Sequence, residues 1–270
     1  MQPPIVVYVE LQGNLGNQMF QIAAAYAHAH RQEAQGAVLR ISSHSSASRT
    51  NFTDTGLLHK CQAYVGDEPS SECAVTREPH FHYASIPNDA RSLRGYYQSS
   101  LYFADVKDTI LDLFDAPTGV KTAVHTTYAR YLENKDAVVV HVRRGDYMSF
   151  PTIHGILTPL YYKTAMQRFR DARGVDCSFY VFSDDIAYCQ TAFEDEANVS
   201  FIDEPDMHKA LYFMSQFRYY VLANSSFSWW AAYSGTAAET VMVPERWFGP
   251  HGPQDYHDIY EPDWIRLPVS

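Results

Sequence analysis

Apolar residues in the second half of the chain fall into short runs separated by longer segments of helical period. The runs are rich in β-branched and aromatic residues, which predicts buried strands that end in polar residues. They are AVVVHVRR (137–144), CSFYVFSDD (177–185), NVSFID (198–203), YYVLANSS (219–226) and TVMVPERW (240–247). The intervening segments predict helices at 161–173, 186–195, 206–217 and from 229 onward. This alternation predicts right-handed βαβ units and a mostly parallel sheet.

The first half begins with a similar unit and then loses its pattern. IVVYVEL (5–11) predicts a strand, GNLGNQ (13–18) a polar loop, and residues 19–34 a helix. The stretch 41–94 is rich in Ser and His and has weak periodicity, so its internal layout is not predicted.

Length and composition limit the class of protein. A chain of 270 residues can form two domains of ordinary size, which we expect at 1–130 and 131–270. The net charge of −10 argues against a nucleic-acid partner, because a polyanion requires an extended basic face. The four cysteines are scattered without zinc-ligand spacing, so we expect reduced, mostly buried thiols. Neither an export signal nor a membrane span is predicted, which favours the cytoplasm, or the Golgi lumen if the chain is a trimmed domain.

Four polar segments follow predicted strands. In parallel α/β sheets ligands bind outside the carboxyl ends of the strands, so these segments are the candidate site. They are GNLGNQ (13–18), HVRRGDY (141–147), FSDD (182–185) and ANSSFS (223–228).

GNLGNQ lacks the full glycine pattern of a dinucleotide-binding loop. It is either a tight strand-to-helix turn or a loop that points the amides of Asn14, Asn17 and Gln18 toward sugar hydroxyls.

HVRRGDY carries groups suited to a pyrophosphate, because an arginine fork binds phosphate oxygens in bidentate fashion. Successive side chains at a strand end point to opposite faces, so Arg143 and Arg144 are expected to differ in role. Arg143, in phase with His141, is expected to face the ligand. Asp146 either orients an arginine or accepts a proton from a hydroxyl.

The other two segments each have a structural and a functional interpretation. FSDD could hold a divalent ion, but N-capping and hydrogen bonds to a ligand are favoured since no second carboxylate or histidine cluster accompanies it. ANSSFS precedes an apolar helix start, where hydroxyls and backbone N–H groups can hold a phosphate. Trp229 and Trp230 after it are expected in the core.

Taken together, five motifs resemble glycosyltransferase family 11, the α-1,2-fucosyltransferases. They are GNLGNQMFQIA, GYYQSSLYF, HVRRGDY, FYVFSDD and ANSSFSWWAA. The resemblance implies a GT-B-like α/β fold, with two Rossmann-type domains whose mostly parallel sheets face each other across a cleft. It further implies acceptor binding on the N-terminal side, GDP-fucose in the C-terminal domain, and inverting transfer to the 2-hydroxyl of a terminal galactose on an oligosaccharide or glycolipid. The reaction is expected to need neither a metal nor a cofactor.

The resemblance assigns residues to two regions. Donor-side residues are His141, Arg143, Arg144, Ser183, Asp184, Asp185, Asn224, Ser225, Ser226, Phe227 and Ser228. Residues of the acceptor loop are Asn14, Gly16, Asn17 and Gln18. Asn14 stands where the family usually has glycine, which leaves the backbone conformation there open.

The catalytic residues are expected among Arg143, Asp146 and His154. Arg143 would stabilise the charge on the departing GDP, Asp146 is the first candidate base, and His154 is the second, as a neutral imidazole near pH 7. Two alternatives stay open: another GDP-sugar transferase, such as a protein O-fucosyltransferase, and a non-catalytic glycan-binding protein on the same scaffold.

Overall fold

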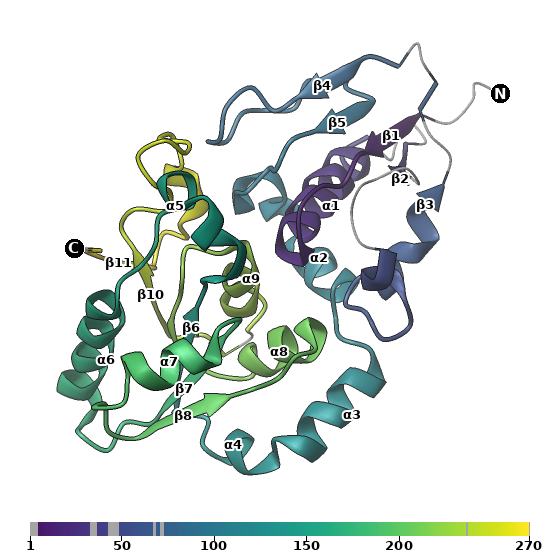
Figure 1. The fold of residues 1–270 in the computed structure, drawn as a ribbon. Helices are drawn as coiled ribbons and strands as arrows, with labels where there is room; N and C mark the ends of the chain where they lie inside the picture. Colours follow the sequence, from purple (N-terminus) through teal and green to yellow (C-terminus); the bar gives the residue numbers. More distant parts are fainter. Residues whose placement is uncertain are drawn as a thin grey trace. The chain divides into compact units, whose positions relative to one another are not determined.

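The chain folds into two compact units of parallel α/β structure. A computed structural model describes residues 5–32, 37–42, 49–66, 69–70, 73–235 and 237–269 (Figure 1). Unit 1 comprises Met1–Pro117 and Asp255–Glu261, and unit 2 comprises Thr118–Gln254 and Pro262–Ser270. Within the described ranges, no helix combines the length and apolar character that crossing a bilayer requires.

The division between the units differs from the expected boundary at residue 130. Helix α3 (Thr118–Thr127) packs against α8 (Met207–Met214), and its Val120 and Val124 are buried. Residues 118–130 therefore belong to unit 2. The chain also returns to unit 1 at Asp255–Glu261, close to its C-terminal end.

Unit 1 is built on a five-stranded sheet in which every strand pair is parallel. The strand order is β3-β2-β1-β5-β4. The strands are β1 (Val6–Val9), β2 (Val38–Ser42), β3 (Val65–Gly66), β4 (Val75–Arg77) and β5 (Ser92–Arg94). Helix α1 (Leu15–His30) is buried on most of its surface, because its many small residues let it pack closely against β1 and β2.

Unit 2 is built on a six-stranded parallel sheet of order β11-β10-β9-β6-β7-β8. The strands are β6 (Val138–Val142), β7 (Phe179–Ser183), β8 (Val199–Ile202), β9 (Tyr219–Val221), β10 (Thr240–Pro244) and β11 (Ile265–Leu267). Numbered within the unit, the order is 3-2-1-4-5-6, that of a Rossmann sheet. The predicted fold class of two parallel α/β units is confirmed.

Short helices fill the connections. The remaining α-helices are α2 (Lys107–Leu113), α4 (Ala129–Glu133), α5 (Pro151–His154), α6 (Pro159–Arg173), α7 (Ile186–Ala192) and α9 (Ser226–Tyr233). The 3₁₀-helices are η2 (Arg49–Phe52), η3 (His59–Tyr64), η4 (Ser100–Tyr102), η5 (Ala104–Val106), η6 (Gly145–Ser149) and η7 (His257–Ile259).

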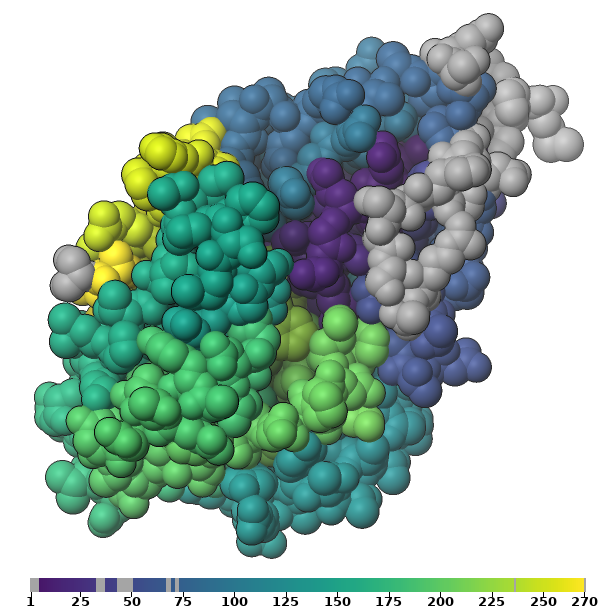
Figure 2. All heavy atoms as spheres, viewed as in Figure 1, coloured from purple at the N-terminus to yellow at the C-terminus, as the bar shows by residue number. Residues whose placement is uncertain are grey.

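The central strand β6 is buried along its whole length, as its continuous apolar run predicts. Val138, Val140 and Val142 belong to the core that includes residues of α6. In the space-filling view, teal and green side chains of the segments that carry α5, α6 and α7 cover the visible face of unit 2 (Figure 2). The predicted burial of Trp229 and Trp230 is confirmed.

All four cysteines are free thiols, but the expectation that most of them are buried holds for only two. Cys61 and Cys189 are buried, and Cys73 and Cys177 are half-buried.

The reversal of strand order positions the site. In unit 2 the chain runs from β6 outward to β8 and then returns to the other side of β6 with β9. A crevice forms at such a switch point because the connections leave in opposite directions. HVRRGDY begins in the last two residues of β6 and continues into the loop after it, and ANSSFS follows β9, so both segments lie at this point.

Candidate active site

Arg143 lies one residue beyond β6 and is held by two carboxylates. Its Nη2 donates to Asp146 Oδ1 at 2.6 Å, and its Nη1 lies 2.8 Å from Asp184 Oδ2. The guanidinium carbon is 5.5 Å from the centre of the Tyr147 ring. The side chain keeps 23% of its surface exposed, so the fork is both oriented and accessible.

Arg144 makes a different set of contacts, as the alternation at the strand end predicts. Its Nε donates to Asp185 Oδ2 at 3.0 Å, and its guanidinium carbon lies 3.5 Å from the centre of the Tyr188 ring. Its backbone N–H donates to Asp184 Oδ1 at 2.9 Å. The Arg144 side chain is therefore a structural neighbour that joins the loop after β6 to the start of α7.

The FSDD segment at the end of β7 supplies one carboxylate to each arginine. Asp185 N-caps α7, because its Oδ1 accepts from the Tyr188 N–H at 3.1 Å, and the Ser183 hydroxyl accepts from the Asp185 N–H at 2.9 Å. Asp184 bridges the Arg143 side chain and the Arg144 backbone. These aspartates thus face guanidinium groups, an arrangement that disfavours a divalent ion.

Gly145 permits the close approach of Asp184. A Cβ added at residue 145 would overlap Asp184 Oδ2, and the Asp184 carboxylate is held in place by Arg143 Nη1 at Oδ2 and by the Arg144 N–H at Oδ1. The glycine of the R-R-G-D run is thus required by packing against the carboxylate.

His141 lies within unit 2, with its ring 5.7 Å from that of Phe227 on α9. It is 5% exposed, and its Nδ1 is buried without a hydrogen-bond partner in the described part of the chain. Burial, and secondarily the charge of Arg143, lowers the pKa of His141 to about 3. The ring is therefore neutral at physiological pH.

The start of α9 is closely tied to the loop after β6. Tyr147 donates its hydroxyl to the Asn224 carbonyl at 2.9 Å, and burial raises the pKa of Tyr147 to about 12. The Asn224 amide donates to the carbonyls of His154, Gly155 and Trp247. Asn224 thus fixes two loops beside the site.

The three serines of ANSSFS differ in exposure: Ser225 and Ser228 are buried, and Ser226 is half-buried. Ser225 N-caps α9 by accepting from the Phe227 N–H, and buried Ser228 donates to the carbonyls of Ala223 and Ser225. Ser226 and Phe227 are half-buried. The donor contacts expected of this segment stay predictions, with the first turn of α9 as the accessible part.

His154 ends α5, and its ring stacks on Tyr147 with centroids 4.3 Å apart. Burial lowers its pKa, opposed by Asp146 and assisted by Arg143. The imidazole is therefore neutral near pH 7 and can accept a proton.

In unit 1, the loop GNLGNQ joins β1 to α1. Gly13 takes the positive φ of 74°, whereas Asn14 is extended at φ −85° and ψ 177°. The replacement of glycine by Asn14 is therefore tolerated without backbone strain.

The other residues of this loop differ in burial and in their hydrogen-bond partners. Gln18 is buried and bonded to the Gly13 carbonyl and to Asn51, and Asn17 accepts from Gln98 at 2.7 Å. Gly16 is buried, whereas Asn14 is exposed. These contacts explain the turn, and the expected contacts of the four loop residues with sugar hydroxyls stay predictions.

Sequence reasoning did not include Tyr147 and Tyr188 among the site residues. Both place an aromatic ring against an arginine, at 5.5 Å and 3.5 Å from the guanidinium carbon. Tyr147 stood inside the quoted motif, but Tyr188 is separated in sequence from Arg144 and carried no local signal.

The oriented, accessible Arg143 lies at the switch point of a Rossmann sheet, and its loop is bonded to the start of α9, an arrangement that suits an anionic ligand. The sequence pattern of Glycosyl transferase family 11 matches residues 8–268. The chain belongs to this family and is a glycosyltransferase, which confirms the predicted resemblance.

Two relatives agree with this assignment, and one solved structure is similar in fold. The chain is 27% identical to an Escherichia coli α-1,2-colitosyltransferase, over 97% of this chain and 99% of the relative. It is also 27% identical to the galactoside 2-α-L-fucosyltransferase Sec1 of Mus musculus, over 96% of this chain and 72% of the relative. The crystal structure of NodZ α-1,6-fucosyltransferase soaked with GDP-fucose is similar in fold, with a TM-score of 0.55 at 12% identity, over 90% of this chain and 96% of that one.

Proposed function

We propose that the protein is an inverting galactoside α-1,2-fucosyltransferase that transfers fucose from GDP-fucose without a metal ion. The observation that carries the proposal is Arg143, held between Asp146 and Asp184 at the switch point of the unit 2 sheet. The relatives named as α-1,2-fucosyl and α-1,2-colitosyl transferases support the linkage.

In this proposal unit 2 binds the donor and Arg143 binds its pyrophosphate. When the bond from the fucosyl anomeric carbon to the phosphate oxygen breaks, the electron pair leaves with GDP and negative charge grows on the β-phosphate. The Arg143 fork and the N-terminal turn of α9 are preorganised to stabilise that charge. One such donor contributes about 3 kcal/mol to the lowering of the barrier.

The acceptor hydroxyl attacks the opposite face of the fucosyl ring and loses its proton to a base. Asp146 and His154 are the candidates. Asp146 is engaged with Arg143 at 2.6 Å, which favours an orienting role for its carboxylate. His154 is a neutral imidazole that stacks on Tyr147. We propose that it is the base that accepts the proton of the acceptor hydroxyl.

Unit 1 is assigned the acceptor. Asn14 is exposed at the carboxyl end of β1, where its amide can donate to and accept from sugar hydroxyls. The neighbouring Asn17 and Gln18 hold the loop in shape through Gln98 and Asn51.

The test is transfer in the presence of EDTA. The untagged protein is incubated with GDP-fucose and lactose or N-acetyllactosamine, and the product linkage is assigned by NMR. We expect a fucosyl-α-1,2-galactose product at a rate unaffected by the chelator. Absence of both transfer and donor hydrolysis across a broad acceptor panel would overturn the proposal, and dependence on added Mg²⁺ or Mn²⁺ would overturn its metal-free form.

The Escherichia coli relative supports a second donor, GDP-colitose. Colitose lacks the 3-hydroxyl of fucose, so a site that hydrogen-bonds this hydroxyl rejects the deoxy sugar strongly. The ratio of kcat/KM for the two donors on one acceptor decides between them. A ratio above 10 in favour of GDP-fucose supports our assignment, and the reverse ratio makes the protein a colitosyltransferase.

A further inference from the structure

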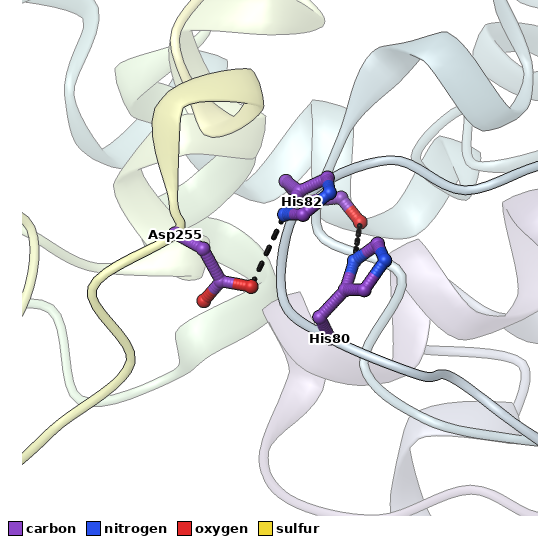
Figure 3. Close-up of side chains that lie close together, drawn as sticks. All are labelled: His80, His82 and Asp255. Atoms are coloured by element: carbon purple, nitrogen blue, oxygen red, sulfur yellow. Dashed lines mark hydrogen bonds and ion pairs between the residues drawn. The ribbon is translucent and has the colours of Figure 1, made fainter.

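Two histidines and an aspartate meet in unit 1, away from every motif of the proposed reaction in the sequence. His80 and His82 follow β4, and Asp255 begins the segment by which the chain returns to unit 1 (Figure 3). One potential ligand atom from each of the three lies within 4.8 Å of the others. We propose that His80, His82 and Asp255 form a binding site for a divalent transition metal, with Zn²⁺ as the fitting ion.

The spacing of the three groups suits a single ion. His82 Nδ1 lies 3.1 Å from Asp255 Oδ2, and the rings of His80 and His82 stack with centroids 3.5 Å apart at 16°. Two ligands at about 2.1 Å from a tetrahedral zinc ion are about 3.4 Å from each other. The groups are therefore close to ligand spacing, and neither the exposed His80 nor the partly exposed His82 is enclosed by the core.

The backbone around the site fixes its parts before any ion binds. The Phe81 N–H donates to Asp255 Oδ2 at 3.1 Å, and the Tyr83 N–H donates to Asp258 Oδ2 at 2.8 Å. The carboxylates of Asp255 and Asp258 thus hold the segment 255–258 against the loop 80–83. Second contacts of this kind orient ligands and reduce the entropy that binding must overcome.

The donor chemistry of the three groups also fits. The half-buried Asp255 side chain supplies carboxylate oxygens, and His80 and His82 supply ring nitrogens. Two imidazole nitrogens are borderline donors that favour Zn²⁺ over Mg²⁺ or Ca²⁺, which require mostly oxygen, and Zn²⁺ also accepts a carboxylate oxygen as a further ligand.

Such an ion would join two parts of unit 1 that are far apart in sequence. His80 and His82 belong to the segment before residue 117, whereas Asp255 lies after the main part of unit 2. The buried Ile259 and the contact of η7 with η4 are the apolar part of the same attachment. Bound Zn²⁺ is therefore expected to stabilise the return segment 255–261 and to leave the donor chemistry of unit 2 unchanged.

The test is calorimetric titration of the full, untagged, chelator-stripped chain with Zn²⁺, and absorption spectroscopy with Co²⁺. We expect one equivalent to bind with a dissociation constant in the micromolar range and to raise the melting temperature. His82→Ala and His80→Ala should each weaken binding at least 30-fold, and Asp255→Asn at least 5-fold. His251→Ala removes an exposed histidine outside the cluster and should bind as wild type does.

Three results would overturn the site. They are the absence of saturable Zn²⁺ binding below 1 mM, equal Zn²⁺ affinity in the His80→Ala/His82→Ala double variant, and visible Co²⁺ absorption bands that persist in the double variant. Because the variants replace exposed side chains, far-UV circular dichroism should confirm their folding. Failure of this site leaves the transferase proposal untouched, since that proposal is tested in EDTA.

Discussion

Replacing Asp184 tests how strongly kcat/KM depends on the orientation of the Arg143 guanidinium. In Asp184→Asn the side-chain oxygen can still accept from the Arg144 N–H. The carboxylate oxygen that lies 2.8 Å from Arg143 Nη1 is replaced by an NH₂ group, which cannot accept from the guanidinium. Both side chains are at least three-quarters buried, so the lost charge-assisted contact is worth about 2 kcal/mol. If this energy orients the fork for the transition state, kcat/KM for GDP-fucose falls about 30-fold.

Asp146→Asn is the matched control, since it removes the other carboxylate on the same arginine. Asp146 is 56% exposed, and an exposed ion pair contributes at most about 1 kcal/mol, so kcat/KM should fall less than about 5-fold. Steady-state kinetics on both variants, with melting curves to establish folding, makes the comparison. Equal, mild losses would refute the orientation argument, and a loss above 100-fold in Asp146→Asn would make Asp146 the base.

Two further predictions concern the same loop. Gly145→Ala introduces a Cβ that overlaps Asp184 Oδ2, so we expect a loss of kcat/KM at least as large as in Asp184→Asn; kinetics near wild type would show that Asp184 can move without consequence. The pKa of His141 falls from 6.5 to about 3 on folding, so the unfolded chain binds more protons between these values and the stability is lost as the pH falls. Lowering the pH from 7 to 5 should therefore reduce the free energy of unfolding by about 2 kcal/mol through His141. Urea unfolding at the two pH values should show a smaller reduction in His141→Asn than in wild type. Identical pH dependence of the two proteins would contradict a neutral buried ring.

Much of unit 2 was predictable because its strands are central and buried on both faces. Runs such as Val138–Val142 carry a strong apolar signal, and each helix after them has a clear period. The polar residues after β6, β7 and β9 then follow from the rule that ligands lie at the carboxyl ends of parallel strands. The sequence thus located the segments of the candidate site.

The pairing within the site was less predictable. Asp184 is 41 residues from Arg143 in the sequence. Side-chain packing after β7 decides which aspartate pairs with which arginine, and the sequence pattern does not show this packing. The histidine and aspartate cluster of unit 1 was missed because Asp255 returns from beyond unit 2, and the only local signal was the His-x-His spacing of residues 80 and 82. Short, partly exposed strands such as β4 also carry little periodicity, which left 41–94 unassigned.

The central claim is that Arg143 binds the pyrophosphate of the donor without help from a metal. Calorimetric titration with GDP in EDTA tests it on wild type, Arg143→Ala, and the surface control Arg168→Ala, which also removes one positive charge. We predict that wild type and Arg168→Ala bind GDP alike, and that Arg143→Ala binds at least about 100-fold more weakly, from the loss of about 3 kcal/mol. Unchanged GDP affinity in Arg143→Ala, in a folded protein, would contradict the account.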